Sequence, residues 1–249
     1  MLLLIDAGNT RVKWALARGD AAPGAWEAQG ACLHAELDAA AATWQGRGVA
    51  RALVSNVAGV AMRERLAALL SPIAIEWFAS SAERAGLVNG YRDPERLGCD
   101  RFAAAIGARA LAPGRALVVA TCGTATTVDA VSGDGRFLGG MILPGLGLMA
   151  GALATNTAQL PRAAPGAAPP PLFADNTNDA IVSGCLSAQA GAIERAVAAH
   201  GGALCMLSGG AAPYVAPALA CAHQVVDNIV LVGLHAVARA PVSMGDKGC

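Results

Sequence analysis

The chain has 249 residues, of which 55% are hydrophobic and only 4% are aromatic. Its formal net charge is +0, which argues against the clustered basic surface that neutralises nucleic-acid phosphates. The length suits one large domain or two smaller ones around an aliphatic core. The 7 cysteines are odd in number and include no C-x-x-C pair. This pattern indicates reduced thiols in a cytoplasmic protein, not a disulfide framework or a zinc site.

The apolar stretches are short. Met1–Ile5 is too short for a signal peptide, and the Gly-rich stretch 145–154 is too short to cross a bilayer. The four histidines are dispersed, so we expect no histidine-based metal site.

The first elements in chain order are two strands, Leu2–Ile5 and Val12–Ala17, joined by a tight turn at Gly8-Asn9. Asp6 stands where the first strand meets the turn. A carboxylate there can hold Mg²⁺ through its waters, and glycine lets the backbone approach a phosphate. The alternative is an ordinary turn in which Asp and Asn side chains bond local backbone.

A strand is next expected over Ala52–Val57, then helices over Ala61–Leu70 and Arg101–Ala112. Asp100 directly precedes the second helix. It either caps that helix or accepts a proton from a substrate hydroxyl during phosphoryl transfer. Arg101 either pairs with a substrate carboxylate or is solvated, and Tyr91 either lines a pocket or fills core.

A second hairpin follows, with strands over Arg115–Thr121 and Val128–Val131 around Gly123, and a third strand over Phe137–Leu143. Gly8 and Gly123 hold the same place in their hairpins, and nearly half the chain lies between them. Two explanations remain open, an internal duplication giving two similar domains or a coincidence between glycine-containing turns.

Further elements are an exposed loop over Pro161–Pro171, a helix over Thr177–Ala199 and a strand over Leu204–Leu207. The strand runs into Ser208-Gly-Gly210, where an adenine ring could lie against backbone. No G-x-x-x-x-G-K-[ST] motif occurs. Phosphate binding would therefore depend on backbone N–H groups of the two hairpins, with hydroxyls and cationic side chains beside them.

Together these motifs resemble the type III pantothenate kinase family, in the family's order and over nearly the whole chain. The resemblance implies an α/β fold of two ribonuclease-H-like domains, residues 1–114 and 115–249, with mixed β-sheets flanked by helices and an ATP cleft between them. The superfamily is that of acetate and sugar kinases, heat-shock chaperones and actin. The matching segments are Asp6-Ala-Gly-Asn-Thr-Arg11, Gly98-Cys-Asp-Arg101, Gly123-Thr-Ala-Thr-Thr127, Gly139-Gly-Met-Ile-Leu-Pro-Gly145 and Asn176-Thr-Asn-Asp-Ala-Ile181.

The resemblance also implies an activity, the ATP-dependent phosphorylation of pantothenate to 4'-phosphopantothenate, which begins coenzyme A synthesis. Asp100 would be the base, and Asp6 would hold Mg²⁺ through water. The family forms cytoplasmic homodimers with shared active sites, so Thr177 would reach pantothenate bound to the neighbouring subunit. The implied ATP-binding residues are Asp6, Ala7, Gly8, Asn9, Thr10, Arg11, Val12, Lys13 and Thr124, and the implied pantothenate-binding residues are Tyr91, Gly98, Cys99, Asp100, Arg101 and Thr177.

One position departs from the family pattern. Thr121 stands where members usually carry an Asp that helps to bind a monovalent cation, K⁺ or NH₄⁺. A neutral hydroxyl is a weaker cation ligand than a carboxylate, so we expect weak or altered K⁺ dependence.

Two other functions remain open. One is a kinase of the same superfamily that acts on a sugar or an acyl substrate, because the substrate motifs are shorter than the phosphate motifs. The other is a non-catalytic accessory factor, since relatives have been named Bvg accessory factors. Intact Asp6, Asp100 and Arg101 argue against an inactive enzyme.

Overall fold

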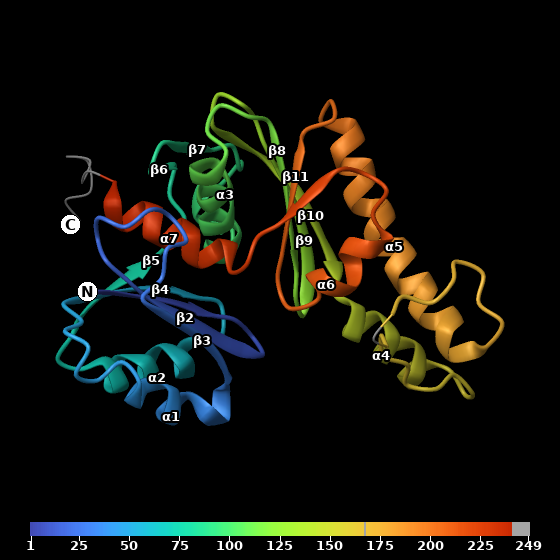
Figure 1. Cartoon of the computed structure of the whole chain (residues 1–249), viewed down its shortest axis with the longest axis horizontal. Helices are drawn as coiled ribbons and strands as arrows, with labels where there is room; N and C mark the ends of the chain where they lie inside the picture. Colours follow the sequence, from blue (N-terminus) through green and yellow to red (C-terminus); the bar gives the residue numbers. More distant parts are fainter. Residues whose placement is uncertain (167, 241–249) are drawn as a thin grey trace. The chain divides into compact units, whose positions relative to one another are not determined.

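The computed structural model describes residues 1–166 and 168–240 (Figure 1). The chain forms two compact units. Unit 1 consists of Met1–Pro113 together with the last helix, α7 (Ile229–Arg239), and unit 2 consists of Gly114–Asn228. Within the described ranges, no helix has both the length and the apolar character needed to span a membrane.

Unit 1 is built on a five-stranded mixed sheet with the order β3-β2-β1-β4-β5. Neighbours β3, β2 and β1 run antiparallel, whereas β1, β4 and β5 run parallel. Helices α1 and α2 cover one face, and α7 packs on the sheet through β1. The strands are β1 (Leu2–Ala7), β2 (Arg11–Ala17), β3 (Ala28–Leu33), β4 (Arg51–Asn56) and β5 (Ala74–Phe78).

The central strand β1 is buried on both faces, which explains its unbroken apolar sequence. Its neighbour β2 is buried at every position from Trp14 to Ala17. The remaining elements of unit 1 are η1 (His34–Glu36), α1 (Leu37–Ala42), α2 (Val60–Leu70), the short hairpin β6 (Glu83–Arg84) and β7 (Leu87–Asn89), η2 (Pro94–Arg96) and α3 (Cys99–Leu111).

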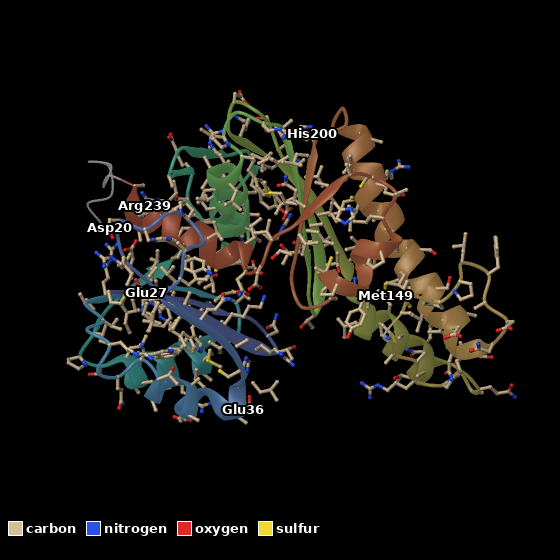
Figure 2. The ribbon with its side chains drawn as sticks, in the orientation of Figure 1. Asp20, Glu27, Glu36, Met149, His200 and Arg239 are labelled. Carbon is tan, nitrogen blue, oxygen red and sulfur yellow. The ribbon has the colours of Figure 1, made fainter. Side chains whose placement is uncertain are left out.

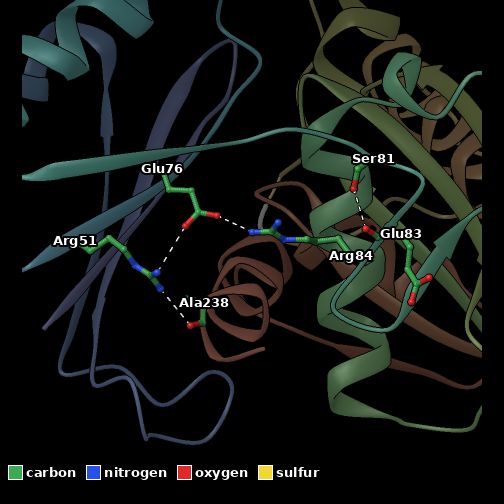
Figure 3. Close-up of polar contacts among 6 residues, drawn as sticks. All are labelled: Arg51, Glu76, Ser81, Glu83, Arg84 and Ala238. Carbon is green, nitrogen blue, oxygen red and sulfur yellow. Dashed lines mark hydrogen bonds and ion pairs between the residues drawn. The ribbon is translucent and has the colours of Figure 1, made fainter. Parts of the chain in front are cut away.

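Helix α7 packs closely on α3. A Cβ on Gly107 or on Gly233 would overlap the backbone of the other helix, so the two backbones touch at these glycines. An ion-pair network adds a polar attachment (Figure 3): Glu76 pairs with Arg84 at 2.7 Å and with Arg51 at 3.7 Å, and Arg51 donates to the Ala238 carbonyl at 3.2 Å. The predicted second domain, 115–249, included this helix, which the structure instead groups with unit 1.

Unit 2 repeats the strand arrangement of unit 1. Its strands follow the order β10-β9-β8-β11-β12, with antiparallel pairs β10–β9 and β9–β8 and parallel pairs β8–β11 and β11–β12. Each pair has the direction of its counterpart in unit 1, which favours duplication over coincidence. The strands are β8 (Leu117–Cys122), β9 (Ala125–Val131), β10 (Arg136–Pro144), β11 (Leu204–Ser208) and β12 (His223–Val225).

The helices of unit 2 cover a core formed by alternate residues of the sheet, such as Val118 and Ala120. They are α4 (Leu146–Asn156), α5 (Thr177–Ala199) and α6 (Ala212–Val215), followed by the short η3 (Ala216–Ala218). The predicted helix over Thr177–Ala199 is confirmed residue for residue. The loop predicted over Pro161–Pro171 contains no helix or strand at its described residues, although Ala163 is buried in the core.

Candidate active site

The β1–β2 turn is a tight connection between two paired strands. Ala7 lies opposite Val12, and the Gly8 N–H donates to the Arg11 carbonyl at 3.0 Å. Asn9 and Thr10 therefore form the exposed tip. The predicted strand–turn–strand unit is confirmed. Ala7 and Val12 have fully buried side chains, so they can contribute only backbone groups to a ligand.

Asp6 is the buried charge beside this turn. It lies opposite Lys13 on β2 and opposite Ser55 on β4, with 8% of its surface exposed. Burial raises the pKa of Asp6 to about 6, Lys13 acts in the opposite direction, and Asp100 raises it further. At neutral pH the carboxylate is therefore mostly ionised but poorly solvated, an environment that favours a bound cation.

Asp100 lies in the first turn of α3. The helix begins at Cys99, two residues earlier than predicted, and its N-cap is Gly98. The prediction that Asp100 might be the N-cap is therefore wrong. Its Oδ1 accepts the Arg101 N–H at 2.8 Å, and a Cβ on Gly98 would lie 2.7 Å from that oxygen. Glycine at position 98 thus leaves room for the Asp100 carboxylate.

Arg101 is a buried cation held by an aromatic side chain. It is 6% exposed, donates to the Tyr91 hydroxyl at 2.7 Å and lies 5.5 Å from the centre of the Tyr91 ring. Asn89 fixes the Tyr91 segment, accepting the Tyr91 N–H and donating to the carbonyls of Ser81 and Pro94. The alternative of a solvated helix arginine is wrong.

Ser55 connects the Asp6 and Asp100 segments. It is fully buried on β4, directly opposite Asp6, and its Oγ lies 3.4 Å from the Cys99 Sγ. Burial raises the pKa of the Cys99 thiol. The strand β1, the strand β4 and the start of α3 thus converge within unit 1, bringing two carboxylates of distant sequence position together.

The β8–β9 turn of unit 2 holds Thr124. The Gly123 N–H donates to the Ala125 carbonyl at 3.0 Å, and the Thr124 carbonyl accepts the Gly145 N–H at 2.9 Å. The Thr124 residue is exposed. This turn is therefore fastened to the start of α4, with its threonine accessible.

Thr121 lies on β8 opposite Thr127 and Ser208. Its buried hydroxyl has no hydrogen-bond partner among the described residues. Asp129 lies two residues beyond Thr127 on the same face of β9 and is 2% exposed. A carboxylate is thus present near the threonine, on a different strand from the family position.

Thr177 is the first residue of α5, whose N-cap Asn176 accepts the Asp179 N–H at 3.0 Å. It borders a groove of about 950 Å³ between α4 and α5. Met149 on α4 (Figure 2) and Ile181 on α5 contribute to its lining. This groove lies wholly within unit 2.

Sequence reasoning missed the residues that support the site. Ser55 and Asn89 carry no motif of their own, and only their packing beside Asp6 and Tyr91 reveals them. Gly209 has a structural explanation, because it has φ +98° and a Cβ there would overlap the backbone of Cys122. Adenine binding near Gly209 stays a prediction.

Solved structures show the fold. A protein from Campylobacter jejuni described as a conserved Baf family transcriptional activator superposes with a TM-score of 0.61 at 17% identity, covering 94% of this chain and 96% of that chain. An activator of 2-hydroxyisocaproyl-CoA dehydratase from Clostridium difficile, solved with bound ADPNP, gives a TM-score of 0.53 at 12% identity, covering 96% and 92%. The chain therefore shares the fold of these solved proteins, with two mixed sheets flanked by helices.

The sequence itself identifies the family. The family described as type III pantothenate kinase matches residues 2–199. A type III pantothenate kinase of Herminiimonas arsenicoxydans is 56% identical over 251 residues, covering 96% of this chain and 97% of the relative. The chain belongs to the type III pantothenate kinase family. Membership confirms the predicted activity, phosphorylation of pantothenate in coenzyme A synthesis, over a sugar or acyl kinase.

Proposed function

We propose that unit 1 carries out the chemical step, with Asp100 as the general base for the pantothenate hydroxyl. The hydroxyl oxygen attacks the γ-phosphorus of ATP, its proton passes to the Asp100 carboxylate, and ADP leaves. The observation that carries this proposal is the convergence of the Asp6 and Asp100 segments. Ser55 lies opposite Asp6, and its Oγ lies 3.4 Å from the Sγ of Cys99, the residue before Asp100. A phosphoryl-transfer site needs one group for the metal–phosphate side and one for the acceptor.

The proposed phosphate contacts come from both glycine turns. Asp6 would hold Mg²⁺ through water, and the ion would offset the charge of the phosphates. The buried, mostly ionised Asp6 fits such an ion. The proposed ATP-binding residues are Asp6, Ala7, Gly8, Asn9, Thr10, Arg11, Val12 and Lys13 in unit 1 and Thr124 in unit 2.

Arg101 is proposed to bind the pantothenate carboxylate. A buried guanidinium that already rests on Tyr91 is pre-organised for a planar, bidentate partner. Gly98 and Cys99 would contribute the backbone beside it, and Thr177 would contact the same substrate.

Replacing Asp100 by Asn tests the base. The amide keeps the size of the side chain but cannot accept the hydroxyl proton, so turnover should fall by roughly 10²–10⁴-fold. ATP affinity and melting temperature should change little. The Asn amide oxygen can still accept the Arg101 N–H, so the start of α3 should be preserved. Unchanged turnover in folded Asp100→Asn protein would therefore remove Asp100 from catalysis.

We also propose a homodimer with shared active sites. Unit 2 exposes apolar side chains at its groove and beside it. Leu153 on α4 lines the groove and is 38% exposed, and Phe173, which is 92% exposed, directly precedes the lining residue Ala174. A second copy of the chain could cover them, and Thr177 borders the same groove. Mixing Asp100→Ala protein with Thr177→Ala protein should restore activity, since a mixed dimer would leave one site intact. No recovery despite proven subunit exchange would reject shared sites.

Monovalent-cation activation is proposed to be weak, because Thr121 offers a neutral hydroxyl. Turnover should be similar in Na⁺, K⁺ and NH₄⁺ buffers, and Thr121→Asp should gain K⁺ activation. Strong K⁺ activation of the unaltered protein would instead indicate that Asp129 or carbonyl oxygens bind the ion. We propose a cytoplasmic location, which six described free cysteines support.

A further inference from the structure

His34 contacts the β1–β2 turn from a distant part of unit 1. It is the first residue of η1, and its Nε2 lies 2.8 Å from the Gly8 carbonyl oxygen. A carbonyl oxygen only accepts, so the ring nitrogen donates and Nε2 carries the proton. The contact joins the chain segment after β3 to the backbone of the turn.

The backbone around His34 is itself anchored. The Leu33 N–H donates to the Glu36 carboxylate at 2.8 Å, which closes η1 (Figure 2 labels Glu36). Arg65 on α2 donates to the His34 carbonyl at 2.6 Å and pairs with Asp38 on α1. The backbone of His34 is therefore held by Arg65, and its half-buried side chain is held by the Gly8 carbonyl.

The bond to Gly8 orients one peptide group. In a trans peptide the carbonyl of one residue and the N–H of the next point in opposite directions. Holding the Gly8 carbonyl toward His34 therefore directs the Asn9 N–H away from it. The Gly8 N–H is fixed separately by the Arg11 carbonyl. Both sides of Gly8 are thus constrained at the place where backbone N–H groups would meet phosphate.

We propose that His34 is a positioning residue for ATP, which acts through the Gly8 carbonyl and touches neither substrate. This inference rests on the proposed function, since it requires the β1–β2 turn to bind the ATP phosphates. Losing the bond lets the Gly8–Asn9 peptide rotate, and part of the binding energy is then spent on ordering it.

The test is a comparison of Michaelis constants. His34→Ala should raise the KM for ATP by about three- to tenfold, as expected for one hydrogen bond. The KM for pantothenate and the kcat at saturating ATP should stay unchanged. His34→Gln places an amide nitrogen at the position of Nε2 and should restore most of the ATP affinity, whereas the shorter His34→Asn should not.

His200 provides the matched control. Its Nε2 makes the same kind of bond, 3.0 Å from the Val131 carbonyl, at the end of α5 in unit 2 (Figure 2). His200→Ala should lower the melting temperature without altering either Michaelis constant. If His34→Ala protein is insoluble, the Gln and Asn variants make the same comparison with polar side chains of graded length.

A Lys13→Ala variant distinguishes the positioning role of His34 from the assignment of the β1–β2 turn to the ATP phosphates. If Lys13→Ala raises the KM for ATP and no His34 variant does, the inference about His34 is wrong and the phosphate assignment stands. If neither residue affects the KM for ATP, the assignment of the turn to phosphate is wrong. The positioning role would also be overturned if His34→Ala and His34→Gln each changed the KM for ATP and the KM for pantothenate by the same factor.

Discussion

The two hairpins, β1–β2 and β8–β9, have the same topology but different charge. Each begins with a central strand that is paired on one side antiparallel and on the other parallel. Two residues before the turn glycine, the first hairpin carries Asp6 opposite Lys13, and the second carries Thr121 opposite Thr127. The two units therefore share the backbone arrangement of the turn, and only the first has a buried carboxylate, Asp6, opposite a lysine.

The difference shows which property the repeat preserves. Both hairpins have paired strands and a glycine whose N–H closes the turn, and a glycine leaves room for a ligand to approach the backbone. A buried carboxylate has a desolvation cost, which raises the pKa of Asp6 to about 6. A buried carboxylate that destabilises the fold indicates a functional role, so we expect substitutions in the first hairpin to affect turnover more than those in the second.

The largest expected effect is on turnover. Asp6→Asn removes the carboxylate proposed to hold hydrated Mg²⁺, and turnover should fall on the order of 10²–10³-fold, as for other charge-stabilising groups. Thr121→Val is the matched change in the second hairpin and should leave turnover near that of the unaltered protein. Steady-state assays at saturating ATP and pantothenate measure both. Similar losses in the two variants would remove the contrast between the hairpins.

Asp6→Asn should lower turnover but raise the stability of the folded protein. The folded-state pKa of about 6 lies above the ordinary value of 3.8, so the folded protein binds this proton more tightly than the unfolded chain. The contribution to stability is present below about pH 3.8 and is lost as the pH rises through about 6. Asp6→Asn should therefore stabilise the protein above pH 6 by up to about 3 kcal/mol.

Denaturant unfolding of both proteins without Mg²⁺, at a series of pH values, measures that gain. It should shrink toward zero in acid. An Asp6→Asn variant that is no more stable at neutral pH would show that Lys13 fully offsets the burial of the carboxylate.

Two neighbouring hydroxyls of the second hairpin should behave differently. Thr126 donates to the Gln189 Oε1 at 2.6 Å, whereas the Thr121 hydroxyl has no partner among the described residues. Thr126→Val should destabilise by about 1–3 kcal/mol, because it leaves a buried acceptor unsatisfied. Thr121→Val should stabilise by about 1 kcal/mol, because it removes a polar group without breaking a bond. Denaturant unfolding measures both changes. If the two substitutions changed the unfolding free energy in the same direction, this assignment of the hydroxyls would be contradicted.

Local pattern was sufficient to predict both hairpins and helix α5, because apolar runs and turn glycines act over a few residues. It could not place α7 in unit 1. That result depends on Gly107 and Gly233 meeting across a helix crossing, and glycines inside helices do not reveal their partners in sequence.

In the candidate site, too, residues in local motifs were predictable and residues that act through tertiary packing were not. Asp6, Asp100 and Arg101 were identifiable because they lie in short motifs beside turns and helix starts. Their supports were not, because Ser55 acts through strand register and His34 through a bond to backbone. The start of α3 was predicted two residues late because Asp is a preferred N-cap residue, whereas Gly98 is the N-cap and Cys99 packs against Ser55.

The smallest expected effect on stability is that of replacing the turn glycines Gly8 and Gly123 by alanine. These variants test whether the glycines only form the turns or also let phosphate approach the backbone. A Cβ on Gly123 would make an ordinary contact, 3.6 Å from the Ala125 carbonyl, and one on Gly8 would lie 3.3 Å from the Arg11 carbonyl. Neither glycine has a positive φ, so alanine meets no conformational barrier. Gly123→Ala should stabilise by about 0.4–1 kcal/mol through the unfolded chain, and Gly8→Ala should be close to neutral.

If these glycines serve close approach to phosphate, both variants should still weaken ATP binding, because the new methyl group occupies the path of the ligand. Calorimetric titration with ATP beside thermal unfolding distinguishes the cases, and unchanged ATP affinity in both variants would leave the glycines as turn residues only.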